Sequence, residues 1–311
     1  MIRTVDYHSA GEPFRIVLSG VPEIPGATVR ERRAAVPEEA DTIRRLVCHE
    51  PRGHADMYGC FLVPPDDDGA HLGVLFWHKD GYSTACGHGT IALGTWAVES
   101  GRVTAAANGE TDVIIDVPSG RVTARVRSTE GRVKSVAFRN VPSYVLARDV
   151  PYRSARVDVS YGGAVYVSVR AADLGLSVTP DALPELIRAG REVKAALAPM
   201  VDHPDGIYGT ILYDELPDTP DGPHQRNVTV FADGEVDRSP CGSGTSARLA
   251  LLCPDGVLTH DSIVGTRFLG RVVDHTEAGV ITEVEGTAHL TGEHRFTLDP
   301  DDALGTGFVL R

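Results

Sequence analysis

Two short segments of this chain repeat nearly the same sequence, and each places a cysteine in front of a glycine-rich turn. Residues 85–90 read Ala-Cys-Gly-His-Gly-Thr, and residues 240–245 read Pro-Cys-Gly-Ser-Gly-Thr. The two cysteines, Cys86 and Cys241, are 155 positions apart, about half of the 311 residues. The repeat therefore predicts a duplicated fold with one thiol in each half.

Weaker repeats elsewhere have similar offsets. Residues 6–16 and 158–169 both predict two strands joined by a turn, and they are offset by 152 positions. Gly-Arg-Val occurs at 120–122 and again at 270–272. Because these matches keep the same order along the chain, they support a duplication of the whole fold rather than of one motif.

Each half is predicted to contain strands, then a helix that begins near its cysteine, then further strands. The helices expected after the two motifs cover residues 90–100 and 245–252, and both are apolar on nearly every face, which is typical of a helix surrounded by sheet. The predicted strands lie at 56–63, 72–77, 112–117, 121–126, 209–213, 227–231 and 280–284. An amphipathic helix is expected at 183–197, and loops at 63–69 and 215–223.

Charge and cysteine content exclude several classes of protein. The net charge of −13 disfavours non-specific binding to nucleic acid and to anionic membrane surfaces. No apolar run approaches a membrane span, and the first residues lack the apolar core of a signal peptide. Five cysteines do not resemble a secreted disulfide framework, so we expect a cytoplasmic protein with reduced thiols. Cys48, Cys60 and Cys253 lack the glycine-rich context and are interpreted as small buried side chains.

The glycine-rich motifs indicate anion and thiolate chemistry. Unpaired backbone N–H groups converge at the start of a helix, which carries about half a positive charge. A thiolate is favoured there, with a lowered pKa, and a carboxylate substrate is favoured for the same reason. Gly87, Gly89, Gly242 and Gly244 allow a ligand to approach the backbone closely.

Two facing thiols suit the inversion of a carbon that carries an acidic proton. One thiolate removes the α-proton of an amino acid, and the other group, still a thiol, returns a proton to the opposite face. Backbone N–H groups would stabilise the enediolate that develops. The chain has no GxGxxG after a strand and no P-loop, so we expect no cofactor, and no metal.

Two polar residues near the cysteines are candidates for binding substrate. His88 could polarise the substrate or tune the Cys86 thiolate, or it could merely cap the helix. Asp237 could hold the ammonium or secondary amine of a substrate, or it could form a turn or pair with Arg238.

At these residues the chain resembles the proline racemase family. The matching motifs extend over almost the whole length and lie at residues 6–17, 52–59, 83–89, 203–204, 237–246 and 262–265. The family includes proline racemases, 4-hydroxyproline 2-epimerases and trans-3-hydroxy-L-proline dehydratases. The resemblance implies an α/β (α+β) fold like that of diaminopimelate epimerase, with two pseudo-symmetric halves. Each half would be a curved, mostly antiparallel sheet wrapped around a central helix, with the site between the halves. We expect residues 1–128 plus 300–311 to form the half with Cys86, and residues 129–299 to form the half with Cys241.

The resemblance also implies roles for particular residues. It implies Cys86 and Cys241 as the acid/base pair, a small amino-acid substrate, and a homodimer. The substrate-binding residues that it implies are Gly87, His88, Asp237, Gly242 and Ser243.

Both cysteines are present, which favours a cofactor-independent racemase or epimerase acting on proline or a hydroxyproline. Dehydratases of the family typically replace one cysteine, often the second by threonine, because their 3-hydroxyl leaves and one base is enough. However, residues 56–64, 71–75, 162–164 and 229–237 resemble the dehydratase branch. Many racemases and epimerases have Asn and Thr where this chain has Ala164 and Ser243. A trans-3-hydroxy-L-proline dehydratase that forms Δ1-pyrroline-2-carboxylate is therefore the alternative. A non-catalytic binding protein and a cysteine hydrolase are further alternatives; the hydrolase would need a base, and only His88 is nearby in sequence.

Overall fold

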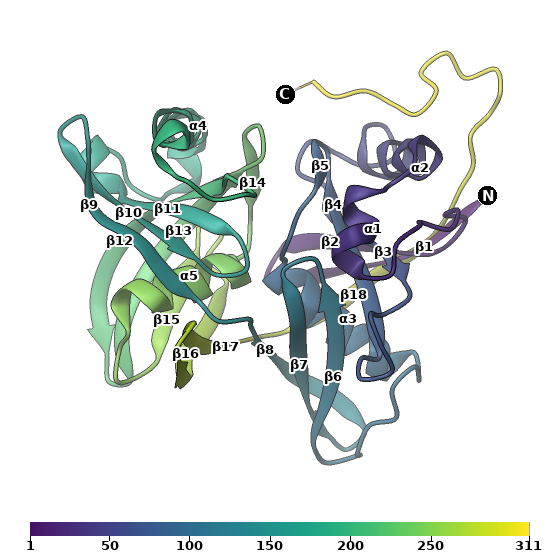
Figure 1. The fold of residues 1–311 in the computed structure, drawn as a ribbon, viewed down its shortest axis with the longest axis horizontal. Helices are drawn as coiled ribbons and strands as arrows, with labels where there is room; N and C mark the ends of the chain where they lie inside the picture. Colours follow the sequence, from purple (N-terminus) through teal and green to yellow (C-terminus); the bar gives the residue numbers. More distant parts are fainter. Residues whose placement is uncertain (311) are drawn as a thin grey trace. The chain divides into compact units, whose positions relative to one another are not determined.

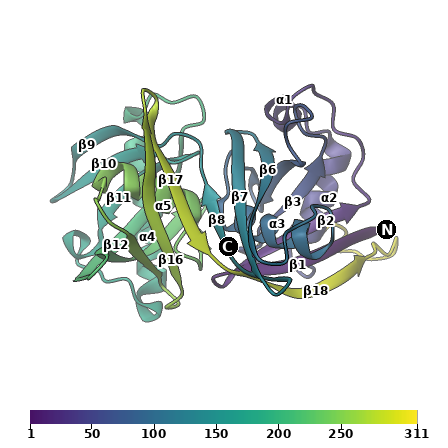
Figure 2. The same cartoon turned by 90° about the horizontal axis from the view of Figure 1, so that it is seen from below.

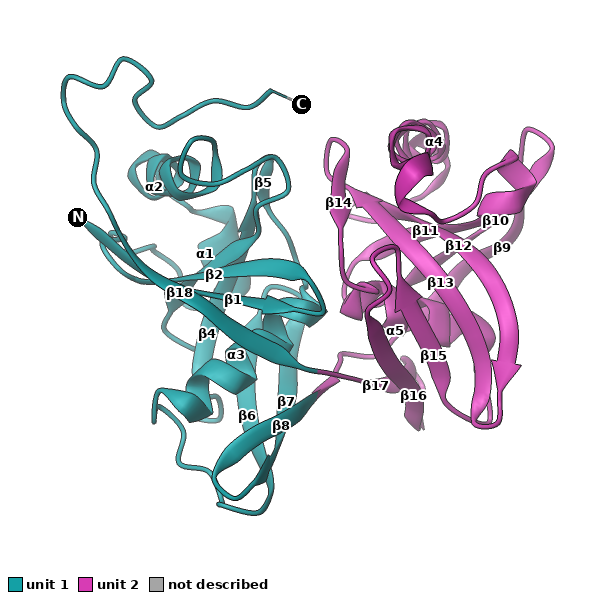
Figure 3. Ribbon diagram, turned by 180° about the vertical axis from the view of Figure 1, so that it is seen from behind, with its two compact units in different colours: residues 1–136, 287–311 teal, residues 137–286 magenta. Residues whose placement is uncertain are grey.

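The computed structural model describes residues 1–310 and divides the chain into two compact units (Figures 1 and 3). Unit 1 contains Met1–Val136 and Thr287–Arg311, and unit 2 contains Ala137–Gly286. The expected boundaries were 128/129 and 299/300. The observed second boundary falls earlier because β18 (Ala288–Phe296) pairs antiparallel with β1 (Ile2–Ser9), so this strand belongs to the sheet of unit 1.

Unit 1 begins with the hairpin β1–β2 and holds one long buried helix. Besides β1 and β18, its strands are β2 (Glu12–Ser19), β3 (Gly59–Val63), β4 (Leu72–His78), β5 (Gly81–Tyr82), β6 (Gly109–Val117) and β7 (Gly120–Thr129). Its helices are α1 (Val29–Ala34), α2 (Glu38–Cys48) and α3 (Gly87–Glu99). The strand β8 (Arg132–Arg139) runs across the boundary into unit 2.

Unit 2 has a similar composition of elements. Its strands are β9 (Tyr144–Tyr152), β10 (Ala155–Tyr161), β11 (Val165–Arg170), β12 (Ile207–Thr219), β13 (Gly222–Phe231), β14 (Glu235–Asp237), β15 (Leu258–Ser262), β16 (Arg267–Thr276) and β17 (Gly279–Gly286). Its helices are α4 (Leu183–Leu197), α5 (Gly242–Leu252) and short 3₁₀ turns at Ala171–Leu174, Pro180–Ala182 and Ala198–Met200.

The order of strand pairing is the same in the two units, which confirms the predicted pseudo-symmetry. An opening hairpin is followed by a parallel pair, β2 with β3 in unit 1 and β11 with β12 in unit 2. A short antiparallel strand then leads into the central helix, β5 before α3 and β14 before α5. The chain afterwards returns to the sheet in parallel, with β4 beside β6 and β13 beside β15.

Each sheet curves around its central helix (Figure 2). In unit 1, α3 packs against β1, β2, β7 and β18; in unit 2, α5 packs against β9, β10, β16 and β17. Residues 87–97 of α3 and 242–251 of α5 are all buried, so neither helix has a solvent face. This explains why both sequences are apolar on every side rather than amphipathic.

Two parts of the sequence-based description were incomplete. Residues 215–223, predicted as a loop, instead continue β12 and β13 into a hairpin whose ladder runs to Thr219 and Gly222. The helices α1 and α2 were not predicted; α1 begins with a capping box between Thr28 and Glu31. Within the described residues, no helix has the length and apolar content needed to cross a membrane.

Candidate functional site

The predicted site residues fall into two groups, one in each unit, and each group surrounds the start of a central helix. In unit 1, Cys86 is the residue that caps α3: its Sγ accepts a hydrogen bond from the Gly89 N–H at 3.2 Å. The Thr90 hydroxyl donates to the Cys86 carbonyl at 2.8 Å and so fixes the backbone of the cysteine. The sulfur therefore lies at the positive end of the helix, as the sequence predicted.

His88 lies directly against this thiol. Its ring nitrogens Nδ1 and Nε2 are 3.4 and 3.6 Å from Cys86 Sγ. The imidazole is held edge-on by two aromatic rings, with centroid distances of 5.8 Å to Phe14 and 5.0 Å to Tyr58. Since Cys86 itself caps the helix, the contact of His88 is with the sulfur. A role in tuning the thiolate stays a prediction.

In unit 2, Cys241 has a different backbone conformation. Its φ of 62° lies in the left-handed region, which a non-glycine residue adopts only when its surroundings hold it there. The Thr245 N–H and hydroxyl both donate to the Cys241 carbonyl at 2.7 Å. The Cys241 N–H donates to the Ser239 hydroxyl at 3.1 Å, and that hydroxyl donates to Asp237 Oδ1 at 2.7 Å. Hydrogen bonds on both sides of the cysteine thus stabilise the strained turn.

Asp237 is buried at the end of β14. Its Oδ1 accepts hydrogen bonds from both the N–H and the hydroxyl of Ser239. This is the turn-forming role considered as the alternative for this residue. A role in holding a substrate amine stays a prediction.

The pKa of Cys241 differs from the sequence-based expectation, which was a lowered value. Burial raises the pKa of the Cys241 thiol strongly, and the negative charge of Asp237 adds to this. The Gly244 N–H lowers the pKa, but its effect is smaller than the loss of solvation. The expectation was wrong at this residue because it considered the helix terminus without the burial.

The second glycine of each motif leaves room for the sulfur, and Gly89 also leaves room for the ring of Phe14. A Cβ atom built on Gly89 would lie 2.4 Å from Phe14 Cε2 and 2.8 Å from Cys86 Sγ, and one built on Gly244 would lie 2.9 Å from Cys241 Sγ. All three distances are too short for a contact with a carbon atom. Gly87 and Gly242 form the first residues of the two helices, and Ser243 follows in the first turn of α5.

Several residues around Cys241 were not indicated by the sequence. The imidazole of His260 lies beneath the start of α5, with Nδ1 2.8 Å from Thr245 Oγ1 and Nε2 2.7 Å from Asn227 Nδ2. Asn227 also donates to the Pro240 carbonyl at 2.9 Å. The threonine repeated in the two motifs was an available signal for Thr245. His260 and Asn227 come from separate strands, so only the fold brings them to the helix.

The Tyr166 hydroxyl is also close to the thiol. It lies 2.7 Å from Ser243 Oγ and 3.8 Å from Cys241 Sγ. Tyr166 belongs to β11, and its place within the second repeated hairpin gave no indication of a site.

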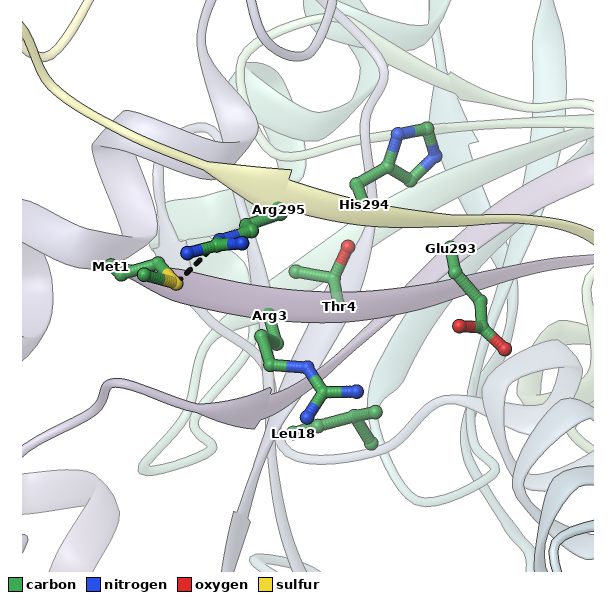
Figure 4. A pocket seen from close by; sticks show the side chains of 7 residues that line it. All are labelled: Met1, Arg3, Thr4, Leu18, Glu293, His294 and Arg295. Carbon is green, nitrogen blue, oxygen red and sulfur yellow. Dashed lines mark hydrogen bonds between the residues drawn. The ribbon is translucent and has the colours of Figure 1, made fainter.

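A separate surface pocket of about 520 Å³ lies on unit 1 between β1, β2 and β18 (Figure 4). Arg295 extends along its wall, and its Nε donates to Met1 Sδ at 2.7 Å. The lining residues are Met1, Arg3, Thr4, Leu18, Glu293, His294 and Arg295. None of them belongs to the predicted site, so this pocket and the thiol groups are distinct.

The sequence is similar to that of curated enzymes over its full length. It is 46% identical to a 3-hydroxyproline 2-epimerase of Burkholderia multivorans, covering all of this chain and 98% of the relative. It is also 46% identical to a trans-3-hydroxy-L-proline dehydratase of Burkholderia ambifaria, with the same coverage.

The fold is likewise shared with a solved enzyme. A crystal structure of a hydroxyproline epimerase from Agrobacterium vitis, with trans-4-hydroxy-L-proline bound, has a TM-score of 0.90 at 31% identity and covers 99% of this chain and 94% of its own. The family model described as proline racemase matches residues 4–309. The resemblance expected from the sequence is confirmed, and the chain belongs to the proline racemase family of enzymes.

Proposed function

We propose that this enzyme inverts the α-carbon of 3-hydroxyproline, with the thiols of Cys86 and Cys241 as base and acid. The observation that carries the proposal is the cysteine at the start of each buried central helix, one in each unit. The choice of a 3-hydroxylated ring is supported by the two Burkholderia relatives described above, both of which are named for 3-hydroxyproline.

The two thiols are proposed to start in different protonation states. The raised pKa of Cys241 supports a thiol that donates a proton. Cys86 receives a hydrogen bond from Gly89 and contacts His88, which supports a thiolate. In the proposed step, the Cys86 thiolate removes the α-proton and becomes a thiol, while the Cys241 thiol gives its proton to the opposite face and becomes a thiolate.

The remaining predicted residues are proposed to bind the substrate. The backbone N–H groups at the helix starts, at Gly87, His88, Gly242 and Ser243, would hold the carboxylate and stabilise the enediolate as its charge develops. The carboxylate of Asp237 would hold the ring nitrogen. Because C3 keeps its configuration, inversion at C2 would convert trans-3-hydroxy-L-proline into cis-3-hydroxy-D-proline.

The second candidate is dehydration of trans-3-hydroxy-L-proline to Δ1-pyrroline-2-carboxylate. The name of the Burkholderia ambifaria relative favours it. Elimination needs a base on only one face, so it would leave Cys241 without an essential role as proton donor.

The test is incubation with proline, 3-hydroxyproline and 4-hydroxyproline isomers in deuterated water, followed by NMR. The proposal predicts exchange of the α-proton together with inversion at C2. Cys86→Ser and Cys241→Ser should each abolish inversion. If Cys241→Ser retained full turnover and gave only Δ1-pyrroline-2-carboxylate, the dehydratase would replace the epimerase.

Protection from alkylation gives an independent test of both thiols. Iodoacetamide should inactivate the enzyme, and the planar analogue pyrrole-2-carboxylate should slow labelling of both Cys86 and Cys241 in peptide mass spectra. Labelling of either cysteine at an unchanged rate would contradict its role. Cys253, expected from the sequence to be buried, is instead exposed and serves as the internal control.

We also propose that the enzyme works in the cytoplasm, where thiols stay reduced. The homodimer implied by the family stays a prediction, to be measured by light scattering.

A further inference from the structure

A pair of buried hydroxyl groups lies beside the proposed proton donor. Tyr166 reaches from β11 to the first turn of α5, where its hydroxyl is 2.7 Å from Ser243 Oγ. Cys241 Sγ is 3.8 Å from the tyrosine oxygen and 4.0 Å from the serine oxygen. Tyr166 and Ser243, called here the hydroxyl pair, are 0% and 2% exposed.

The surroundings of the hydroxyl pair are apolar and hold the tyrosine ring in place. Tyr166 packs in one cluster with Ala164, Ile211 and Ala247. Tyr208 meets the Tyr166 ring edge-on, with a centroid distance of 5.7 Å and an angle of 84°. Burying a hydroxyl in such a cluster costs free energy unless the hydroxyl has polar partners. We therefore expect a polar group near each of these hydroxyls.

The Cys241 thiol donates to the Tyr166 oxygen at 3.8 Å, and the hydroxyl pair has hydrogen-bonding capacity beyond this bond and its own contact. The two hydroxyls carry two hydrogens, and only one of them can lie between the two oxygens. The second hydrogen and the remaining lone pairs can serve a further polar group within about 3 Å.

The distance between Cys241 Sγ and the hydroxyl pair limits which substrate atom the hydroxyl pair could contact. A reacting carbon lies about 3.5 Å from the sulfur that exchanges its proton. An oxygen on the neighbouring ring carbon is about 2.4 Å from that reacting carbon, whereas an oxygen one carbon further away is more than about 3.5 Å from it. Hydroxyls about 4 Å from the sulfur are therefore closer to the oxygens two bonds from the reacting carbon, those of the carboxylate and of C3, than to an oxygen on C4. The proposed function assigns the carboxylate to backbone N–H groups, which leaves the C3 substituent for the hydroxyl pair.

We propose that the Tyr166–Ser243 hydroxyl pair recognises the hydroxyl on C3 of the substrate and thereby selects 3-hydroxyproline over proline and 4-hydroxyproline. This inference rests on the proposed α-carbon chemistry, because it places the reacting carbon at Cys241. A site built to hydrogen-bond a substrate hydroxyl discriminates strongly against analogues without it, since its own buried polar groups then lose their partner.

The test compares Tyr166→Phe and Ser243→Ala with the wild-type enzyme on trans-3-hydroxy-L-proline, proline and trans-4-hydroxy-L-proline. We expect kcat/KM for the 3-hydroxylated substrate to fall about 10- to 100-fold in each variant, since one buried hydrogen bond is lost. In Tyr166→Phe, the values for the other two substrates should change less than about threefold. Ser243→Thr keeps the hydroxyl and should retain most of the selectivity.

Tyr144→Phe is the matched control. It removes a tyrosine hydroxyl from β9 of the same unit, in a ring that stacks on Tyr161 and not on the site. It should leave all three kcat/KM values unchanged. Thermal melting of every variant excludes misfolding as the cause of a loss.

The outcomes separate this inference from the proposed function. An equal fall for all three substrates in Tyr166→Phe would mean that the hydroxyl pair serves Cys241 rather than the substrate, and the inference would be overturned. If the wild-type enzyme exchanged no α-proton in any substrate, the proposed function itself would fail. If the wild-type enzyme turned over only 3-hydroxyproline, the comparison would use the inhibition constant of pyrrole-2-carboxylate in place of kcat/KM for proline and 4-hydroxyproline. That constant should not change in Tyr166→Phe, and a tenfold rise would overturn the inference.

Discussion

His260 should make the stability of unit 2 dependent on pH. The imidazole is 0% exposed, and its Nε2 accepts a hydrogen bond from the Asn227 amide, which only the neutral ring can do. Burial, and to a smaller extent the nearby positive charge of Arg248, lower the pKa of His260 from 6.5 to about 3. A protonated imidazole is therefore excluded from the folded protein at ordinary pH.

The sign of the effect follows from the two protonation states. Below pH 6.5 the unfolded chain binds a proton at this histidine and the folded chain does not, so the free energy of unfolding falls as the pH falls. The slope approaches about 1.4 kcal/mol per pH unit. The full contribution is present above pH 6.5, and about 2 kcal/mol of it is lost between pH 8 and pH 5.

Urea unfolding of the wild-type protein, His260→Gln and His275→Gln at pH 8 and pH 5 measures this contribution. His275 is exposed and provides the matched control. Circular dichroism is the suitable probe, because both tryptophans, Trp77 and Trp96, lie in unit 1. His260→Gln should be less stable than wild type at pH 8, and this difference should shrink by about 2 kcal/mol at pH 5. A difference that is the same at both pH values would refute the assignment of a neutral, buried imidazole.

Three further changes test the site and the packing beneath it. Gly244→Ala places a carbon 2.9 Å from Cys241 Sγ and 3.2 Å from Ile211 Cδ1, so kcat/KM should fall about 100-fold and the melting temperature should fall as well. An active variant would show that the sulfur has room to move. Burial and the charge of Asp237 raise the pKa of Cys241, so removing that charge in Asp237→Asn should move the alkaline limb of the kcat/KM profile to lower pH. KM should rise as well, and an unmoved limb would contradict the coupling between Asp237 and Cys241. Gly94→Ala brings a Cβ within 2.7 Å of Ala124 Cβ and should destabilise unit 1 by about 1–3 kcal/mol in thermal unfolding. An unchanged stability would show that α3 can shift to relieve this contact.

The sequence predicted the central elements because their signals are local. The cysteine, the two glycines and the threonine recur in both motifs, and each marks the start of a helix: α3 begins at Gly87 and α5 at Gly242. Apolar residues on all sides of these helices indicated that sheet surrounds them, as observed. The helix α4 covers the predicted residues 183–197.

Other elements depend on contacts between distant residues and could not be predicted in this way. The strand β18 joins unit 1 because it pairs with β1, almost 290 positions earlier in the chain, and no local pattern specifies that partner. Residues 215–223 contain several prolines and aspartates, which favour a loop, but pairing along β12 and β13 outweighs those local preferences.

The duplicated motif by itself determined that two thiols each begin a buried helix in matching halves. Only the tertiary structure decided how the two thiols differ. Cys86 lies against His88 in an extended backbone, whereas Cys241 is held at positive φ by Thr245 and Ser239. The physical reason is that the protonation of a thiol depends on its solvation, which is set by strands from distant parts of the chain that pack around each central helix. The hydrogen-bond partners His88, Ser239 and Thr245 are local. Two nearly identical sequences therefore give one thiol in contact with an imidazole and another whose pKa is raised by burial.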